Sequence, residues 1–272
     1  MNLIGIMQGR LSNRPSSRLQ SFPWKSWAEE FTYARQLQFD LIEWLFDDED
    51  YKHNPIWMPE GLQEIRARIK ESGVRVLTCC GNYFLAHPFF RVTEDQRQKS
   101  IQVLSQLIAQ AGQLGIRTIL LPVLEASEIR TPAEAGQLLE SLQKPLEMAA
   151  NLGVCLGLET ELPAPDYVAL IERAGHPFLG AYYDTGNHTA HGHDCVHDIK
   201  MLASCLVGVH IKDRKRGGPN VLLGLGDVDF DHFFPALRQT GYAGPVVLET
   251  TPGEDAIGNA RKHLEFVRER LR

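Results

Sequence analysis

Four residues of metal-binding types recur at one kind of position in this 272-residue chain. Glu159, Asp184, His210 and Glu249 each stand within two residues of the end of a short, mostly apolar run. Three carboxylates and an imidazole cannot share a half-buried place without a compensating positive charge. A divalent cation would supply that charge, and oxygen ligands with one nitrogen suit Mn, Mg, Co or Zn. Together the residues predict one divalent metal ion, although a loop cap or a surface salt bridge explains each of them alone equally well.

The apolar runs belong to a repeated pattern of elements. A helical stretch ends at a glycine, an apolar run follows and a polar loop comes next, as at Gly73, Gly115 and Gly153. Glycine provides the left-handed conformation that ends a helix, and a continuous apolar run is typical of a strand buried on both faces. The predicted strands are residues 2–7, 40–46, 74–80, 117–123, 154–160, 179–184, 206–211 and 245–250. The clearest predicted helices are residues 26–38, 60–72, 94–114, 132–151, 230–240 and 257–271.

Three helix starts have a recognisable capping pattern. Ser26 with Glu29, Thr93 with Gln96 and Thr131 with Glu134 have the spacing of capping boxes. Proline follows Thr131, and proline is favoured at the first position of a helix.

The alternation of buried strands and helices predicts an α/β fold with a single (β/α)8 TIM barrel over residues 1–272. Active sites of this fold lie where the strands end, and neighbouring strands are about 4.8 Å apart. The four candidate ligands end the last four strands, so we expect them to converge. We expect the irregular segments 9–23 and 81–93 to lie over this end. An open doubly wound sheet is the alternative, but no Gly-x-Gly-x-x-Gly follows the first strand.

Composition limits the class of protein. Apolar residues make up 43% and charged residues 23%, which is ordinary for a globular chain. A formal net charge of −6 argues against nucleic acid or an anionic membrane as the main partner. The five cysteines have no CxxC spacing and are interpreted as reduced thiols. The apolar start is too short for a signal peptide, and no run is long enough to span a membrane, so we expect a cytoplasmic protein.

The candidate ligands resemble the metal site of the xylose-isomerase-like TIM-barrel sugar epimerases and isomerases. Three strings are similar to those of ketose and ketose-phosphate 3-epimerases, especially L-ribulose-5-phosphate 3-epimerases. They are residues 183–187 (YDTGN), 209–213 (VHIKD) and 224–230 (GLGDVDF). Residues 5–11 (GIMQGRL) and 39–44 (FDLIEW) also resemble the starts of such chains, less specifically.

The resemblance implies a metal-dependent epimerase that inverts C3 of a ketose through a metal-stabilised enediolate. Inversion needs a base on one face of the carbon and an acid on the other, and Glu159 and Glu249 would fill these catalytic roles as well as binding metal. An aldose–ketose isomerase, which needs one base, and an inosose-type dehydratase remain alternatives on the same site.

Six further residues are candidates for binding a sugar or sugar phosphate. Asn187 follows Asp184 by three positions, and Lys212 and Arg216 follow His210 by two and six. The others are Glu43, which ends the second strand, Arg10, which follows the first and suits a phosphate, and His87 in an aromatic loop. Each also has a structural explanation: a capping asparagine, a solvated charge run or, favoured for His87, a packed surface loop.

Other classes of protein find less support. The histidine-rich run 188–197 has no HExxH arrangement, and Gly192 interrupts any helical face, so a second metal site is not expected there. There is no Gly-x-Ser-x-Gly or Walker motif. An abasic-site endonuclease shares the barrel but would carry a histidine ligand where Asn187 stands. A barrel that only binds sugar or a partner protein is a third class, and association into a homo-oligomer is an analogy with related barrels.

Overall fold

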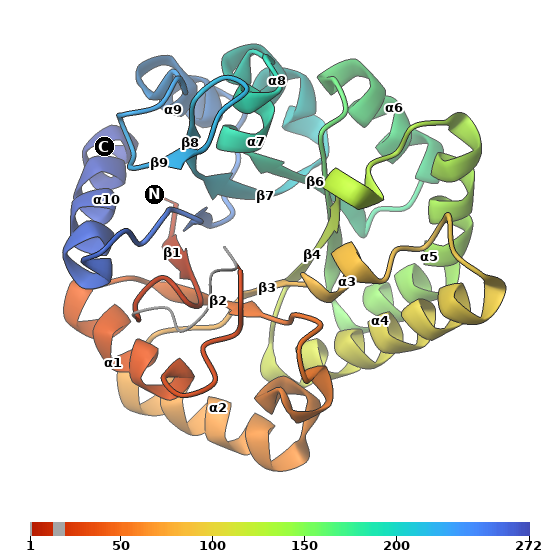
Figure 1. Cartoon of the computed structure of the whole chain (residues 1–272), viewed down its shortest axis with the longest axis horizontal. Coiled ribbons are helices and arrows are strands. Elements are labelled where there is room, and N and C mark those ends of the chain that lie inside the picture. Colours follow the sequence, from red (N-terminus) through yellow and green to blue (C-terminus); the bar gives the residue numbers. More distant parts are fainter. Residues whose placement is uncertain (1, 13–19) are drawn as a thin grey trace.

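Eight short apolar segments form the parallel strands of a closed barrel in the computed structural model, which describes residues 2–12 and 20–272. The strands are β1 (Ile4–Met7), β2 (Leu41–Leu45), β3 (Thr78–Cys80), β4 (Thr118–Val123), β5 (Cys155–Thr160), β6 (Leu179–Asp184), β7 (Leu206–Ile211) and β10 (Val246–Leu248). Apart from the first residue of β5 and the first two of β7, all of their residues are buried, because helices cover the outside and side chains fill the inside. Neighbours in the barrel follow the order of the chain, and β10 closes it against β1 (Figure 1).

Helices surround the barrel and form the outer ring in Figure 1. The longer helices are α1 (Trp27–Leu37), α2 (Pro59–Ser72), α4 (Glu94–Leu114), α5 (Pro132–Leu152), α6 (Ala164–Ala174), α9 (Phe230–Gln239) and α10 (Ala256–Leu271). Short helices are α3 (Tyr83–Ala86), α7 (Thr185–Ala190) and α8 (Cys195–Met201), with 3₁₀ turns η1 (Tyr51–His53), η2 (Pro55–Trp57), η3 (Glu125–Ser127) and η4 (Leu202–Ser204). The predicted (β/α)8 barrel is therefore confirmed.

Most of the predicted helix ends are confirmed. Gly73, Gly115 and Gly153 end their helices with φ of 74°, 75° and 68°, which is the left-handed region that glycine enters without strain. Both threonine capping boxes form with their predicted partners. The Ser26 box is wrong: Ser26 has φ −131° and ψ 2°, so its backbone is not extended as a capping residue requires, and its side chain makes no capping hydrogen bond.

Some elements differ from the prediction. Strand β3 begins only at Thr78, because the chain from residue 74 contacts β2 by a single bridge between Arg75 and Leu41. A two-stranded hairpin, β8 (Asp213–Arg214) with β9 (Asn220–Val221), forms in the charged run after β7. Helix α6 follows β5 and is not among the clearest predicted helices, although Pro163 and Pro165 stand at its start.

Two loop segments cover the end of the barrel where the strands finish. The carboxylate of Glu30 on α1 accepts hydrogen bonds from the backbone N–H groups of Gly9 and Leu11. Gln20 donates from Nε2 to Glu249 Oε1 at 2.6 Å, so the described parts of segment 9–23 lie at this end, while residues 13–19 fall outside the described residues. Segment 81–93 also lies there, but it contains helix α3 and is not wholly irregular.

The described residues include no helix with the length and apolarity needed to cross a lipid bilayer. All five cysteines are free thiols, as the sequence predicts.

Candidate metal centre

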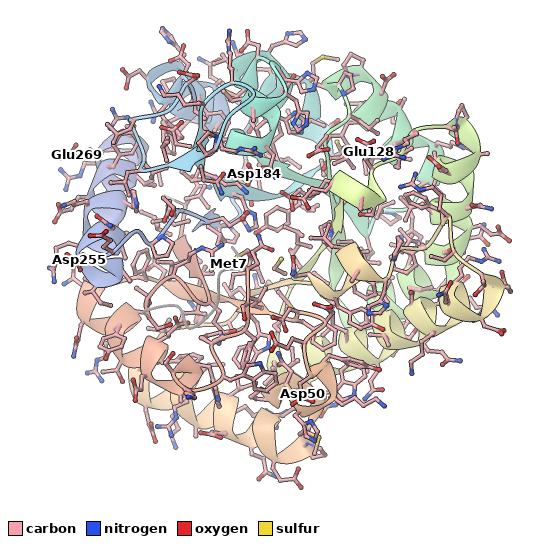
Figure 2. The ribbon with its side chains drawn as sticks, viewed as in Figure 1. Met7, Asp50, Glu128, Asp184, Asp255 and Glu269 are labelled. Carbon is pink, nitrogen blue, oxygen red and sulfur yellow. The ribbon has the colours of Figure 1, made fainter. Side chains whose placement is uncertain are left out.

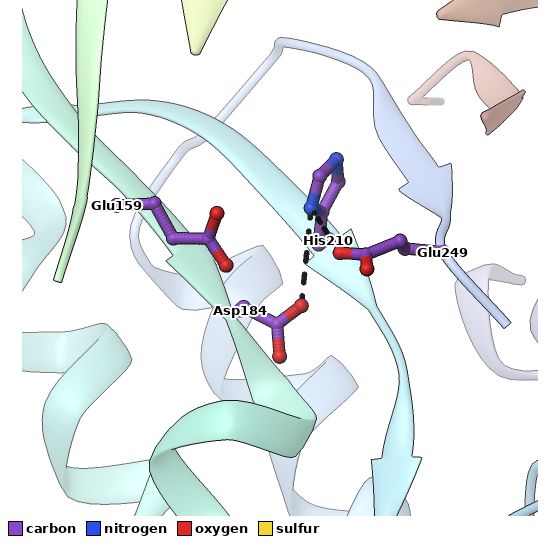
Figure 3. Close-up of side chains that lie close together, drawn as sticks. All are labelled: Glu159, Asp184, His210 and Glu249. Atoms are coloured by element: carbon purple, nitrogen blue, oxygen red, sulfur yellow. Dashed lines mark ion pairs between the residues drawn. The ribbon is translucent and has the colours of Figure 1, made fainter. Parts of the chain in front are cut away.

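Four consecutive strands of the barrel bring the four predicted ligands together. Glu159 lies on β5, Asp184 ends β6, His210 lies on β7 and Glu249 follows β10. Each offers one ligand atom, and these atoms all lie within 4.8 Å of one another. All four residues are buried, and their side chains point to a common centre (Figure 3). In the view down the barrel, Asp184 lies inside the ring of helices, whereas Glu269 lies on its outer edge (Figure 2).

Strand register explains the convergence. Asp184 and His210 are direct partners across β6 and β7. Glu249 stands just beyond the last pair between β10 and β7, and its N–H donates to the carbonyl of Ile211 at 3.1 Å. The ends of these parallel strands therefore hold the side chains at one level of the barrel.

A carboxylate on the side of His210 away from the other three candidate ligands fixes the orientation of its ring. His210 Nε2 lies 2.6 Å from Glu43 Oε1, and the hydroxyl of Tyr182 donates to Glu43 Oε2 at 2.6 Å. Gly208 makes room for the Tyr182 ring, because a Cβ there would lie 2.3 Å from Tyr182 Cε2. With Nε2–H donated to Glu43, the other nitrogen, Nδ1, presents its lone pair to the centre, as histidine ligands of metals do.

The residues fit a divalent cation. Asp184 Oδ2 and His210 Nδ1 are buried and make no hydrogen bond, although they face each other at 3.8 Å. Nδ1 also lies 2.8 Å from Glu249 Oε2 as an ion pair, marked in Figure 3. Both atoms have ion pairs, Nδ1 with Glu249 and Oδ2 with Lys212, but no hydrogen bond. Two buried ligand atoms in this condition, aimed at one point, fit the coordination of a cation. The set of carboxylates and one imidazole has the chemistry of a site for Mn, Mg, Co or Zn.

The pKa values of the ligands show the same deficit of positive charge. Burial, together with Asp184 and Glu249, raises the pKa of Glu159 to about 8. Burial alone would lower the pKa of His210, but the carboxylates of Glu43 and Glu249 outweigh it and raise that pKa well above its usual value. Without a cation, the centre therefore balances its carboxylates by holding extra protons.

Glu249 differs from Glu159 in its surroundings. Burial would raise the pKa of Glu249, but Lys212 and His210 outweigh this effect and hold it well below the ordinary value. Lys212 is buried, and its Nζ lies 2.9 Å from Glu249 Oε1 and 3.3 Å from Asp184 Oδ2. Arg10, also buried, has Nη2 3.8 Å from Glu249 Oε1. The structure thus places two of the predicted substrate-binding cations against the candidate ligands.

Asn187 links the centre to its surroundings. Its Nδ2 donates to Glu159 Oε1 at 2.9 Å, and its backbone N–H donates to Asp184 Oδ1 at 2.6 Å. Its Oδ1 accepts from Arg214 Nη1 at 3.1 Å. Asn187 therefore orients two candidate ligands and is itself held by a guanidinium.

Buried side chains also hold the backbone on either side of Glu159. The hydroxyl of Tyr167 donates to the carbonyl of Leu158, and His188 Nε2 lies 3.0 Å from the carbonyl of Thr160. These carbonyls lie at and beyond the last register pair between β5 and β6, so side chains replace the strand contacts there. His188 belongs to the histidine-rich run, but its role is this anchor, with Nδ1 3.0 Å from Asp198. Among the described residues, the only group close enough to share a metal is the set of four.

A cavity of about 520 Å³ opens at the centre. It is lined by Gln20, Cys80, Asn82, Leu85, Pro122, Leu124, Glu125, Glu159, Asn187, Lys212, Arg214, Pro219, Asn220 and Glu249. A small polar molecule would therefore contact two candidate ligands, several amides and two cations. Sequence reasoning did not name Gln20, Asn82 or Arg214, although it placed the segments 9–23 and 81–93 over the barrel and considered the charged run 212–216.

Three predicted substrate-binding residues lie elsewhere. Glu43 has no exposed surface, and both of its oxygens are used by His210 and Tyr182. Arg216 is exposed, because it lies in the turn of the hairpin, where its backbone N–H donates to Asp227. His87 is exposed and stacks on Tyr83 with ring centroids 4.2 Å apart, outside the cavity lining.

The sequence matches one family model and several known proteins. The family model described as "Xylose isomerase-like TIM barrel" matches residues 31–270. The chain is 28% identical over 255 residues to the L-ribulose-5-phosphate 3-epimerase UlaE of Escherichia coli, covering 90% of each chain. It is 27% identical to the enzyme of the same name from Salmonella heidelberg, again covering 90% of each.

Solved structures share the fold. An L-ribulose 3-epimerase matches with a TM-score of 0.80 at 23% identity, covering 100% of this chain and 95% of the other. A D-psicose 3-epimerase from Clostridium cellulolyticum H10 matches with a TM-score of 0.79 at 17% identity, covering 100% and 99%.

Proposed function

The chain belongs to the xylose isomerase-like TIM barrel family, and from this premise we propose that it is a divalent-metal-dependent epimerase that inverts C3 of a ketose or ketose phosphate. The names of the two relatives described above support this reaction, since both are L-ribulose-5-phosphate 3-epimerases. The candidate metal centre supports the dependence on metal. We propose that the molecule works as a cytoplasmic enzyme on a small, diffusible sugar.

The observation that carries the proposal is the position of the two glutamates. Glu159 and Glu249 come from β5 and from the end of β10, and β6 and β7 lie between these strands in the barrel. Their carboxyl groups approach the centre from two sides, with His210 and Asp184 between them (Figure 3). An inversion at carbon needs one group to take a proton from one face and another to return a proton to the opposite face.

The surroundings of the glutamates suit these roles. A bound divalent cation would polarise the ketose carbonyl and so acidify the adjacent C–H bond. Lys212 and Gln20 both donate to Glu249 Oε1, which keeps that carboxyl ionised and oriented as a base. Asn187 donates to Glu159 Oε1 and orients that carboxyl, which would return the proton on the other face. The roles exchange in the reverse reaction.

The cavity offers a sugar both apolar and polar contacts. Leu85, Pro122 and Leu124 form its apolar wall, and amide side chains provide hydrogen-bond partners for hydroxyl groups. This mixture of an apolar wall and a few polar groups fits an open-chain sugar.

The test is incubation of purified protein with ketopentoses and their 5-phosphates in deuterated water, with Mn, Co, Mg or Zn added. We expect deuterium at C3 and formation of the C3 epimer. Exchange at C1 alone would instead indicate an aldose–ketose isomerase, and loss of water an inosose-type dehydratase.

Variants make the test specific to the two glutamates. Glu159→Gln and Glu249→Gln should each lower kcat by about 10²- to 10⁴-fold, as expected for loss of a general acid or base. Glu161→Gln is the matched control, since Glu161 lies next to β5 but outside the cavity lining and pairs with His191 at 3.6 Å. Equal activity of all three variants would contradict the proposed roles.

A further inference from the structure

One cation of the cavity has no acidic partner. Arg214 donates from Nε and Nη2 to the carbonyl of Gly218, at 3.2 and 3.0 Å, and from Nη1 to Asn187 Oδ1. These acceptors are uncharged, and no ion pair of Arg214 is found within residues 2–12 and 20–272. Its positive charge is therefore not neutralised by the described part of the protein.

The neighbouring cations differ in this respect. Lys212 pairs with Asp184 and Glu249, and Arg10 pairs with Glu249, so both serve the candidate metal centre. Lys215, next to Arg214 in the chain, pairs with Asp227 on the exposed side of the hairpin. Of these four cations, only Arg214 both lines the cavity and has no ion pair with a carboxylate of the described residues.

The hairpin holds Arg214 in place before any ligand arrives. Arg214 pairs with Asn220 across β8 and β9. The carboxylate of Asp213 accepts hydrogen bonds from the backbone N–H groups of Gly224, Gly226 and Val228, which fixes the loop after β9. A guanidinium positioned in advance loses little conformational freedom on binding.

The distance from the reacting centre suits the far end of a short sugar. A single amide group, that of Asn187, separates the guanidinium from Glu159, with hydrogen bonds of 3.1 and 2.9 Å on its two sides. A guanidinium has five N–H donors, and the three contacts of Arg214 leave two for a ligand. Paired N–H donors of arginine match the oxygens of a phosphate.

We propose that Arg214 binds a phosphate at the end of the ketose chain, so that the substrate is a ketose phosphate and not the free ketose. This inference rests on the proposed function and narrows its substrate class. A neutral hydroxyl would leave the charge of Arg214 unbalanced in the cavity, whereas a phosphate neutralises it.

The experiment compares kcat/KM for a ketopentose 5-phosphate and the same free ketopentose, in the wild type and in Arg214→Gln. The wild type should prefer the phosphate. In the variant, kcat/KM for the ketopentose 5-phosphate should fall about 30- to 100-fold, mainly through a higher KM, as expected for removal of a charged hydrogen-bonding partner. Its kcat/KM for the free ketopentose should change little. Arg214→Lys should recover part of the loss, and Arg216→Gln, on the same hairpin but exposed, should behave as wild type.

Binding of inorganic phosphate gives a readout that does not depend on turnover. We expect calorimetry to show phosphate binding to the metal-loaded wild type and to Arg216→Gln, with much weaker binding to Arg214→Gln. Far-UV circular dichroism and thermal unfolding of each variant check that the barrel is intact.

The outcomes separate the two proposals. Equal losses on both substrates would show that Arg214 acts only by orienting Asn187, and would overturn the inference. Epimerisation of free ketose as efficient as that of the phosphate would also overturn it, while the proposed function would stand. If the wild type epimerises neither sugar, the proposed function fails and the inference fails with it.

Discussion

Glu43 Oε1 lies 2.6 Å from His210 Nε2, although 167 positions separate the two residues in the chain. The contact crosses the barrel from the middle of β2 to β7, and neither residue has appreciable exposed surface. A carboxylate in this position holds the imidazole ring and makes its other nitrogen a better metal ligand. Glu43 is therefore a positioning residue, acting through His210.

Glu43→Gln should weaken metal binding by about 10- to 100-fold, the range known for partners behind metal ligands. Tyr182→Phe, which removes the hydrogen bond to the other oxygen of Glu43, should have a smaller effect in the same direction. Titration with Mn or Co followed by electron paramagnetic resonance or absorption measures the affinity. An unchanged affinity in Glu43→Gln would show that His210 needs no support or is not a ligand.

Purified protein should contain about one divalent ion per chain when no chelator is used, because only one group of candidate ligands exists among the described residues. Glu159→Gln and His210→Ala should each lose it, and Glu161→Gln should retain it. Elemental analysis by mass spectrometry measures the content. A full complement of metal in His210→Ala would place the ion elsewhere.

Metal binding should release protons near neutral pH. The pKa of Glu159 is raised to about 8 and that of His210 is raised well above its usual value, so both hold protons in the metal-free centre. A divalent cation displaces them, and the apparent affinity should fall as the pH is lowered below about 8. Calorimetry in buffers with different ionisation enthalpies should detect about two protons per ion. Metal binding without proton release would contradict the protonation described for the free centre.

His263 should make the protein less stable in mild acid. It is 3% exposed, and burial lowers its pKa from 6.5 to about 4. The folded state thus favours the neutral ring, so this stabilisation is complete above pH 6.5 and is lost as the pH falls towards 4. The loss is at most about 3 kcal/mol of unfolding free energy.

Urea unfolding at several pH values, compared between the wild type and His263→Gln, isolates this contribution because the carboxylates titrate in both proteins. The wild type should show the steeper decline between pH 6.5 and 4. Parallel curves for the two proteins would show that His263 protonates as readily in the folded state as in the unfolded chain.

The grouping of the four candidate ligands could be predicted from the sequence because its signal is local. Glu159, Asp184, His210 and Glu249 each end an apolar run, and the geometry of a parallel barrel places the ends of such runs together. The capping threonines and terminal glycines could be predicted for a similar reason, since their partners lie three or four residues away.

The rest of the site depends on contacts that cross the molecule. Glu43 has the sequence position of a residue facing substrate, but its true partners, Tyr182 and His210, come from the other side of the barrel. The choice between Arg214 and Arg216 depends on where the chain turns, and the hairpin that sends Arg216 outward is held by Asp213 and three backbone N–H groups of a later loop. Neither the partners of Glu43 nor the position of the hairpin turn can be inferred from spacing along the chain.

The barrel closes where β10 joins β1, and this late closure determines when the candidate metal centre can form during synthesis. Glu249 follows β10, so a ribosome that has made only the first three ligand strands has made a protein with an incomplete set. The capacity to hold the ion would therefore arise only when β10 docks, and metal occupancy would report that all four ligand strands are in place. An ion held by all four residues would bind only the closed barrel, so its removal would lower the free energy of unfolding.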